Sequence, residues 1–311
     1  MSEFYHVSVL LEECLDGLNI KPDGIYVDGT LGGAGHSSRI AARLTTGRLI
    51  GIDRDPVALK AAGQRLAPWQ DRVTLVHANF CEVRRVLDDL GIEAVDGILL
   101  DLGVSSPQLD EAQRGFSYMA DAPLDMRMDG GAALSAYDVV NTWSQDELKR
   151  ILYEYGEERY APQIAAAICR RRAEKNIETT LELTDIIRSA MPAAALREKQ
   201  HPAKRSFQAI RIAVNDELGA VETVMETASS CLNPGGRLAI ITFHSLEDRI
   251  VKNGMAKDAR GCTCPPNFPV CVCGNKPKVK VITRKPITAS DEELERNPRA
   301  RSAKLRVCEK L

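Results

Sequence analysis

The sequence contains no apolar run long enough to cross a lipid bilayer, and its first residues have no basic segment followed by an apolar core. Neither a membrane-spanning helix nor a secretory leader is therefore predicted. We expect a cytoplasmic protein with no membrane partner. Internal repeats are also absent, which excludes the solenoid and propeller architectures that repeats build.

An excess of charge of one sign is lacking as well. The 41 Lys and Arg residues nearly balance the 43 Asp and Glu residues, which leaves a net charge of -2. This balance excludes a strongly basic chain, so any contact with nucleic acid must come from local basic patches. With 311 residues, 44% of them hydrophobic, the chain can bury one large core or two modest cores.

The cysteines do not form the regular pattern of a secreted disulfide framework. There are nine of them, an odd number. Five lie in segments that predict helices or strands: Cys14, Cys81, Cys169, Cys231 and Cys308. We expect these thiols to be reduced and mostly buried.

Residues 24–104 alternate short β-branched runs with helical patterns, which is typical of βαβ units around a parallel sheet. The predicted strands are Ile25–Asp28, Arg48–Asp53, Val73–His77 and residues 97–101. Asp55 followed by Pro56 predicts a helix start, and residues 82–90 predict a further helix. Since open α/β sheets bind ligands at the carboxyl ends of their strands, we expect the functional site there.

Residues 107–205 show no strand pattern, but capping boxes that begin at Ser144 and Thr179 predict helices. This segment is predicted to be an all-helical insertion that recognises the substrate. Residues 206–232 have apolar side chains at steps of three and four, which predicts one long helix against the sheet.

The sheet is predicted to resume after the insertion. Asn233-Pro-Gly-Gly236 is expected to end the long helix, and residues 237–243 to form a buried strand. Residues 279–283 and 305–308 would then add an antiparallel hairpin. The predicted fold class is α/β, with a Rossmann-like sheet and an inserted all-helical domain. Its domain boundaries are residues 1–106 with 206–311 for the sheet, and 107–205 for the insertion.

A glycine-rich turn between Asp28 and His36 follows the first strand and opens a helix, so backbone amides there can approach a ligand. A nicotinamide fingerprint that starts at Gly33 needs glycine where Ser38 stands, so that template fails. Asp53 ends the next strand, where a carboxylate can accept hydrogen bonds from ribose hydroxyls.

S-adenosylmethionine is the cofactor that this combination favours. Asp28 is placed to meet the cationic amino-acid moiety of the cofactor, and Leu232-Asn-Pro-Gly-Gly-Arg237 precedes the later strand. The alternatives stay open: the turn can be tight without a ligand, and Asp28 and Asp53 can be loop caps. Phe80 either covers the adenine or only fills the core.

Asp101-Leu-Gly-Val-Ser-Ser-Pro107 ends the fourth strand and places Asp101 at the ligand edge. An exocyclic base amine is a poor nucleophile, because its lone pair is delocalised into the ring. An acceptor for the amine hydrogens and a water-poor pocket would help its methylation. Asp101 is the candidate for that catalytic role; alternatively, it only contacts the cofactor or caps the turn.

At this point the chain resembles a known family, the bacterial 16S rRNA cytosine-N(4) methyltransferases, called RsmH or MraW. The match spans nearly the whole chain and includes Tyr26-Val-Asp-Gly-Thr30, Gly35-His-Ser37, Ile52-Asp-Arg-Asp-Pro56, Gly97-Ile-Leu-Leu-Asp-Leu-Gly-Val-Ser-Ser-Pro-Gln-Leu-Asp110, Arg114-Gly-Phe-Ser117, Pro123-Leu-Asp-Met-Arg-Met128, Tyr155-Gly-Glu-Glu-Arg159, His201-Pro-Ala203, Arg205-Ser-Phe-Gln-Ala-Ile-Arg211, Phe243-His-Ser-Leu-Glu-Asp-Arg249 and Asn297-Pro-Arg-Ala-Arg-Ser302.

The resemblance implies methyl transfer to the 4-amino group of a cytidine in the decoding centre of 16S rRNA, within the small ribosomal subunit. It implies these cofactor contacts: Ala34, Gly35, His36, Asp53, Phe80, Asp101 and Gln108. Asp28 and Gly33 join them from the turn itself. Where the family commonly has glycine, this chain has Ala34, a change that a backbone contact survives.

An RNA base must be unstacked before its amine can react, and aromatic side chains usually hold it. The candidates are Phe116, Tyr118, Phe243 and His244, which can equally be core residues. Arg205 and Arg211 are the favoured backbone contacts. Other basic segments are residues 170–175, 199–211 and 296–306, which can also be solvated faces.

Four further cysteines gather in a proline-rich segment: Cys262, Cys264, Cys271 and Cys273. They can form a tetrahedral zinc site, stay reduced without metal, or oxidise. The cluster is outside the pattern that the resemblance rests on, so methyl transfer should not depend on it.

Two other functions remain open at this stage. A DNA amino-methyltransferase is disfavoured, because the Asp-Pro-Pro-Tyr type of motif is absent at Asp101-Leu-Gly-Val104, and no DNA partner is expected. A non-catalytic ribosome-assembly factor would keep the cofactor fold. Since no cysteine is expected in the first four strand-end loops, transfer without a covalent base adduct is predicted.

Overall fold

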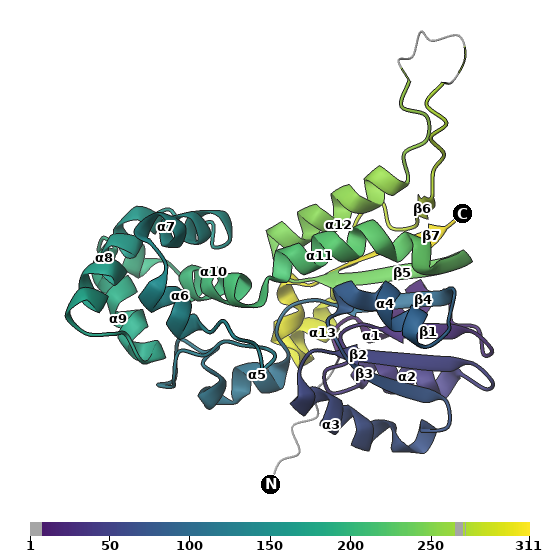
Figure 1. Ribbon diagram of the computed structural model, residues 1–311, viewed down its shortest axis with the longest axis horizontal. Coiled ribbons are helices and arrows are strands. Elements are labelled where there is room, and N and C mark those ends of the chain that lie inside the picture. The colour runs from purple at the N-terminus through teal and green to yellow at the C-terminus, as the bar shows by residue number, and fades with distance from the viewer. Residues whose placement is uncertain (1–7, 265–269, 271) are drawn as a thin grey trace. The chain divides into compact units, whose positions relative to one another are not determined.

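The computed structural model describes residues 8–264, 270 and 272–311 (Figure 1). The chain forms two compact units. One contains Met1–Gly103 and Leu218–Leu311, and the other contains Val104–Glu217. In the described part of the chain, no helix is both long and apolar enough to cross a membrane.

The first unit is built on a seven-stranded sheet with the order β3-β2-β1-β4-β5-β7-β6. Its strands are β1 (Ile25–Asp28), β2 (Arg48–Asp53), β3 (Val73–His77), β4 (Val95–Asp101), β5 (Leu232–Thr242), β6 (Val279–Val281) and β7 (Lys304–Lys310). The first five run parallel, and β7 is antiparallel to both β5 and β6. The predicted α/β class and the predicted antiparallel hairpin are both confirmed.

Helices bury both faces of this sheet, as parallel strands require. They are α1 (Leu11–Leu18), α2 (Gly35–Arg43), α3 (Pro56–Leu66), α4 (Val83–Asp89), α11 (Glu217–Thr227), α12 (Ser245–Asp258) and the shorter α13 (Asp291–Arg296). One apolar core contains residues of α4, α11 and α12, and a second contains residues of α1, α2 and α3 (Figure 1). The strands and helices up to β4 lie within a few residues of their predicted positions.

The second unit contains helices only, apart from one isolated bridge between Pro123 and Thr179 among the described residues. These helices are α5 (Ser106–Asp110), α6 (Ala136–Thr142), α7 (Gln145–Glu154), α8 (Ala161–Glu174), α9 (Thr180–Ala190) and α10 (Lys204–Asn215). Both predicted capping boxes are confirmed: Ser144 begins α7 and Thr179 begins α9. The helices share one apolar core.

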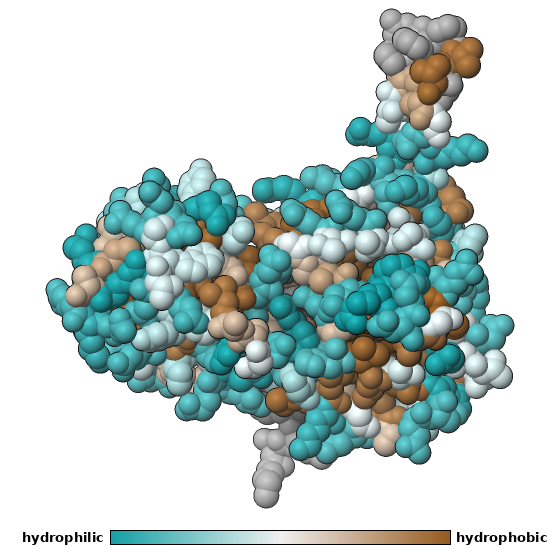
Figure 2. Space-filling view, in the orientation of Figure 1, coloured by the Kyte–Doolittle hydropathy of each residue, from teal (hydrophilic) through white to brown (hydrophobic). Residues whose placement is uncertain are grey.

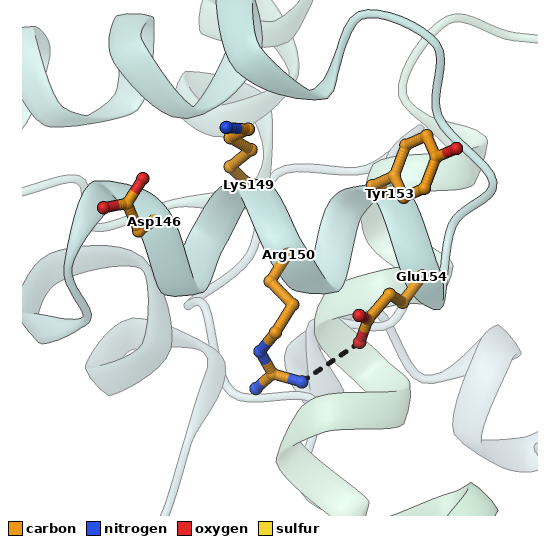
Figure 3. Close-up of a pocket in the computed structure, with 5 residues that line it drawn as sticks. All are labelled: Asp146, Lys149, Arg150, Tyr153 and Glu154. Carbon is orange, nitrogen blue, oxygen red and sulfur yellow. Dashed lines mark hydrogen bonds and ion pairs between the residues drawn. The ribbon is translucent and has the colours of Figure 1, made fainter.

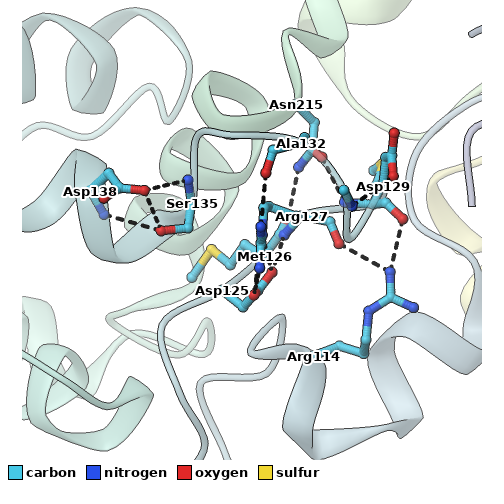
Figure 4. Close-up of polar contacts among 11 residues, drawn as sticks. Arg114, Asp125, Met126, Arg127, Asp129, Ala132, Ser135, Asp138 and Asn215 are labelled. Carbon is cyan, nitrogen blue, oxygen red and sulfur yellow. Dashed lines mark hydrogen bonds and ion pairs between the residues drawn. The ribbon is translucent and has the colours of Figure 1, made fainter.

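A polar network fixes the loop before α6 (Figure 4). Asn215 accepts a 2.8 Å hydrogen bond from the Met128 amide and donates a 2.7 Å bond to the Met126 carbonyl. Arg127 forms a 2.7 Å ion pair with Asp125. Met126 has a φ of 56°, a strained value for a side chain of this size, and the network holds it there.

The predicted single helix over residues 206–232 is wrong. The α10 helix ends at Asn215, Asp216 has a left-handed φ of 47°, and α11 follows. The two helices contribute to different cores, Ile210 and Val214 to the helical unit and Val221 to the sheet unit. The apolar steps of three and four continue through the break, which is why periodicity alone does not reveal it.

The predicted boundary at residues 233–236 is also wrong. These residues do not end a helix, because they belong to β5, which begins at Leu232 after a short 3-10 turn, Ala228–Cys231. The register between β4 and β5 shifts between Val95 and Gly97, so the glycine-containing start of β5 forms an irregular strand end.

Candidate active site

Three carboxylates lie along one edge of the sheet. Asp28, Asp53 and Asp101 stand at the carboxyl ends of β1, β2 and β4, which are adjacent in the order β2-β1-β4. Gly35, at the start of α2, follows β1 at the same edge. The structure therefore places four residues of the predicted cofactor site at one sheet edge: Asp28, Gly35, Asp53 and Asp101.

The glycine-rich turn is tightly packed at its two ends and open in the middle. A Cβ atom on Gly29 would lie 2.5 Å from Leu100 Cδ2 and 3.0 Å from Phe80 Cβ. One on Gly35 would collide with the hydroxyl of Ser8, whereas a Cβ on Gly33 would meet nothing within 4 Å. The closely packed ends explain Gly29 and Gly35, and the open middle leaves backbone accessible.

Asp53 holds the turn to β2. Its carboxylate accepts 2.8 Å hydrogen bonds from the backbone amides of Gly32 and Asp55. A carboxylate offers about four acceptor positions, so two further donors can still be accommodated. Burial raises the pKa of Asp53, although the two amide bonds work in the opposite direction.

Asp28 is more enclosed than the sequence suggested. Its side chain accepts a 2.6 Å bond from the Ser37 hydroxyl and a 3.2 Å bond from the Thr30 amide, and the residue is only 1% exposed. Burial raises the pKa of Asp28 to about 6. The Asp28 carboxylate therefore connects β1 to α2. It can attract the cationic part of a ligand through its negative charge, without a direct hydrogen bond.

Asp101 differs from both. Its Oδ1 is buried and has no hydrogen-bond partner among the described residues, while its side chain as a whole is 25% exposed. Its backbone amide donates a 2.5 Å bond to the Thr30 hydroxyl, which fixes the strand end. Burial, with the negative charges of Asp28 and Glu247, raises the pKa of Asp101 to about 8.

His36 connects Asp101 to the segment before α1. Its Nε2 lies 3.0 Å from the Val9 carbonyl, and its Nδ1 lies 3.8 Å from Asp101 Oδ2. Since a carbonyl only accepts, Nε2 must donate, so in neutral His36 the Nδ1 lone pair faces the carboxyl. The Nδ1–Oδ2 distance of 3.8 Å is longer than a hydrogen bond, so this contact between the two side chains is electrostatic.

The aromatic candidates of the sheet unit are partly buried. Phe80 lies against the Gly29 end of the turn and packs on the core. His244 caps α12, with Nδ1 accepting from the Glu247 amide at 3.4 Å and Nε2 3.1 Å from the Glu247 carboxylate. Its side chain is only 11% exposed, so the structure gives His244 a capping role beside the predicted contact with RNA.

In the helical unit, two aromatic candidates are packed. Phe116 is 6% exposed and belongs to the core, while Tyr118 stacks on His201 with ring centroids 4.5 Å apart. Gln108 completes a capping box with Ser105, whose amide donates a 3.0 Å bond to it, and is described with this unit.

The two favoured arginines differ. Arg211 forms a double ion pair with Glu217, with two 2.8 Å contacts, and its side chain is 17% exposed. That pairing leaves Arg211 poorly placed to bind phosphate. Arg205 is partly exposed on α10 and forms no ion pair within the described range 8–264. Of the two, Arg205 is the better candidate for a backbone contact.

A surface hollow along α7 is an alternative place for a ligand (Figure 3). It is lined by Asp146, Lys149, Arg150, Tyr153 and Glu154. All of these residues come from one helix, and Arg150 is paired with Glu154 at 3.2 Å. With both signs of charge and no buried polar group directed into it, the hollow does not match a cofactor.

Several residues of the site were not identified from the sequence. Thr30 and Ser37 hold Asp101 and Asp28, and Ser8 and Val9 close over the start of α2. Thr30 and Ser37 fall inside motifs that marked the turn, so a signal existed for them. The contacts of Ser8 and Val9 span 27 residues or more and had no local signal.

One argument against a thiol mechanism is wrong. Cys81 lies in the 3-10 turn Phe80–Glu82 that follows β3, so a cysteine does stand in one of the first four strand-end segments. Its amide is bonded to Asn79 at 3.3 Å. A direct transfer must therefore be tested with a Cys81 variant instead of being inferred from the absence of a thiol.

A parallel sheet extended by an antiparallel β7, with carboxylates and a glycine-rich turn along its ligand edge, defines a Rossmann-like methyltransferase domain. The sequence profile of the MraW methylase family matches residues 3–311. The chain belongs to this family.

Sequence similarity to known proteins covers nearly the whole chain. "Ribosomal RNA small subunit methyltransferase H" of Brevibacillus brevis is 60% identical over 99% of this chain and 98% of its own length. The protein of the same name from Heliobacterium modesticaldum is 59% identical, with 99% of each chain covered. A solved rRNA methylase from Streptococcus thermophilus has a TM-score of 0.42 at 12% identity, covering 98% of each chain, and supports no conclusion about function.

Proposed function

We propose that this chain transfers a methyl group from S-adenosylmethionine to the 4-amino group of a cytidine in the decoding centre of 16S rRNA, within the small ribosomal subunit. The observation behind the proposal is Asp101, a carboxylate at the ligand edge with one buried oxygen that lacks a partner among the described residues. The names of the similar proteins support the RNA substrate, and the resemblance of the motifs supports the amine.

The residues present fit the cofactor. Asp53 has acceptor positions left for the two ribose hydroxyls. Phe80, which packs against the Gly29 end of the turn, would cover the adenine. Gly33 offers backbone without a side chain, as an anionic or polar ligand at a helix start requires. When bound, S-adenosylmethionine supplies an electrophilic methyl group on a sulfonium.

Asp101 would act on the base. Its Oδ1 can accept a hydrogen bond from the exocyclic amine, which aligns the nitrogen and increases its electron density as the new bond forms. After transfer the amine must lose a proton, and the ionised form of Asp101 can accept it. Because burial raises the pKa of Asp101 to about 8, the fraction in this form increases as pH rises towards 8. His36 lies next to Asp101, with its Nδ1 3.8 Å from Asp101 Oδ2, and would help to orient the carboxyl group.

The helical unit would bind rRNA. Of the three consecutive arginines on α8, Arg172 donates to the Val140 and Trp143 carbonyls and Arg171 pairs with Glu174 at 3.5 Å. Arg170 faces solvent, and Arg205 on α10 is partly exposed. These two residues are the proposed phosphate contacts of this unit, and Tyr118 stays a proposed base contact. Phe243 and His244 stay proposed base contacts of the sheet unit.

The test uses small subunits purified from cells that lack this chain. Labelled S-adenosylmethionine is incubated with these subunits, with free 16S rRNA and with DNA, and the product nucleoside is identified by mass spectrometry. We expect label only in small subunits or their rRNA, as N4-methylcytidine, and unchanged activity for Cys81→Ser.

Other results would contradict particular parts of the proposal. A 5-methylcytidine product, or loss of activity in Cys81→Ser together with a trapped covalent adduct, would replace direct transfer by thiol attack. Label in DNA would overturn the substrate. Binding to subunits without any labelling would indicate an assembly factor.

A further inference from the structure

A group of thiols lies outside the active site, on the connection between α12 and β6. This connection leaves α12 as two adjacent arms (Figure 1), and Figure 2 shows brown, apolar atoms near the end of this connection. Its described apolar residues Val270 and Val272 are 68% and 72% exposed. Cys262 and Cys264 belong to the first arm and Cys273 belongs to the second. Cys271, the fourth thiol of the sequence prediction, lies outside the described residues.

The three sulfurs have the spacing of metal ligands. The Sγ atoms of Cys262, Cys264 and Cys273 all lie within 4.8 Å of one another, and those of Cys262 and Cys273 are 3.7 Å apart. Zinc–sulfur bonds of about 2.3 Å in a tetrahedron place two sulfurs about 3.8 Å apart. One cation fits at bonding distance from the three atoms with a small adjustment.

Backbone amides point at all three sulfurs. The Thr263 amide lies 3.3 Å from Cys273 Sγ, the Cys264 amide 3.4 Å from Cys262 Sγ, and the Val272 amide 3.4 Å from Cys264 Sγ. Each amide donates to a sulfur and so stabilises the thiolate, the form that binds metal. This is an observation independent of the clustering, since proximity alone does not require amides to point inward.

Hydrogen bonds join the two arms close to the thiols. The Asn275 side chain donates to the carbonyls of Arg260 and Gly261 at 3.1 and 2.7 Å, and the Lys278 amide donates to the Asp258 carbonyl at 2.7 Å. Because these bonds join the two arms directly, the cysteines are brought together by the local fold. A cation binding there gains from this pre-organisation.

We propose that Cys262, Cys264 and Cys273 bind one zinc ion as thiolates, with the fourth coordination position taken by a further donor. Each thiol releases its proton to solvent as its sulfur–zinc bond forms. The ion is structural: it closes the α12–β6 connection and takes no part in methyl transfer, because the thiols lie outside the cofactor edge.

Elemental analysis tests this proposal on the full chain, purified under reducing conditions without chelators. We expect about one zinc ion per chain in the wild type, and its loss when all three cysteines are replaced in Cys262→Ser/Cys264→Ser/Cys273→Ser. Cys169→Ser, on α8 in the helical unit, is the matched control and should keep its zinc. Cobalt substitution should give the thiolate-to-cobalt absorption band in the wild type and in the control only.

Binding of S-adenosylmethionine serves as the folding control. The triple variant should bind the cofactor as tightly as the wild type, so a failure of the zinc site is separable from a failure of the proposed function. Zinc absent from the wild type after reconstitution would overturn the proposal. Zinc retained in the triple variant, or a disulfide among these cysteines in protein purified without oxygen, would do so as well.

Discussion

The pKa values of two buried or partly buried carboxyl groups, one in each unit, are shifted in opposite directions. At the sheet edge, Asp101 has an oxygen without a hydrogen-bond partner in the described part of the chain, and burial raises the pKa of Asp101 to about 8. In the helical unit, Asp125 is also partly buried, but hydrogen bonds from Arg127 outweigh the effect of burial and lower the pKa of Asp125. In the helical loop Arg127 hydrogen-bonds the Asp125 carboxylate, whereas Asp101 at the sheet edge keeps a buried oxygen without such a bond among the described residues.

This difference separates residues that maintain shape from residues that act on a ligand. An unsatisfied buried carboxylate costs stability and persists where function requires it. A saturated network stabilises a loop but has little capacity left for a ligand. Variants in the two regions should therefore have opposite effects on stability and activity.

Asp101→Asn should show the largest effect. It keeps the shape of the side chain but removes the proton acceptor, so the kcat for methylation of small subunits should fall by about 100-fold or more. The affinity for S-adenosylmethionine should change much less. Isothermal calorimetry and single-turnover labelling separate the two quantities, and a fully active variant would exclude Asp101 from catalysis.

The same variant should alter the dependence of stability on pH. The pKa of Asp101 is raised to about 8 in the folded state, against about 3.9 in the unfolded state. Below both values its contribution is complete, and it is lost as pH rises towards 8, since only the unfolded state ionises readily in that window. The wild type should therefore lose unfolding free energy relative to Asp101→Asn between pH 5 and about 8. Equal pH profiles would contradict the raised pKa.

Asn215→Ala should damage stability without affecting the site. It removes three hydrogen bonds, including those to Met126 and Met128, and leaves buried backbone groups unpaired. We expect a loss of about 3 kcal/mol in unfolding free energy, with cofactor affinity unchanged. Asn176→Ala, an exposed asparagine of the same unit, is the control and should cost much less. If Asn215→Ala folds but binds the cofactor more weakly, the claim that this network affects stability alone is contradicted.

Asp53→Ala should weaken cofactor binding by about 5- to 30-fold, from the loss of hydrogen bonds worth about 1 to 2 kcal/mol in total. Asp71→Ala provides the comparison, because Asp71 is an exposed acid with a side chain 65% exposed. Calorimetric titration with S-adenosylmethionine gives both affinities. Unchanged binding by Asp53→Ala would count against the site.

Ala34→Gly should have the smallest effect. Ala34 has a left-handed φ of 57°, which costs a residue with a side chain about 1 kcal/mol, but its buried methyl group contributes about 0.8 kcal/mol. These contributions offset each other, so denaturant unfolding should detect a change below about 0.5 kcal/mol. A large loss of stability would show that packing of the methyl group determines this position.

The sequence predicted the sheet and its ligand edge because strand patterns, helix caps and glycine turns are local signals. It failed at Asp216, since the periodic apolar residues of α10 and α11 continue across a break that separates two cores. It also missed how Asp28 is enclosed by Ser37 and Thr30. Such contacts depend on tertiary packing, which composition and spacing do not encode.

The position of β7 has a consequence for the order of folding during synthesis. This strand is the last in the chain but lies inside the sheet between β5 and β6, with Leu305 fully buried. On the ribosome, the helical unit is complete once Glu217 emerges, whereas the sheet waits for residues 304–310. We therefore expect the nascent chain to expose an unpaired edge of β5 until residues 304–310 have been synthesised, a window in which chaperones would bind.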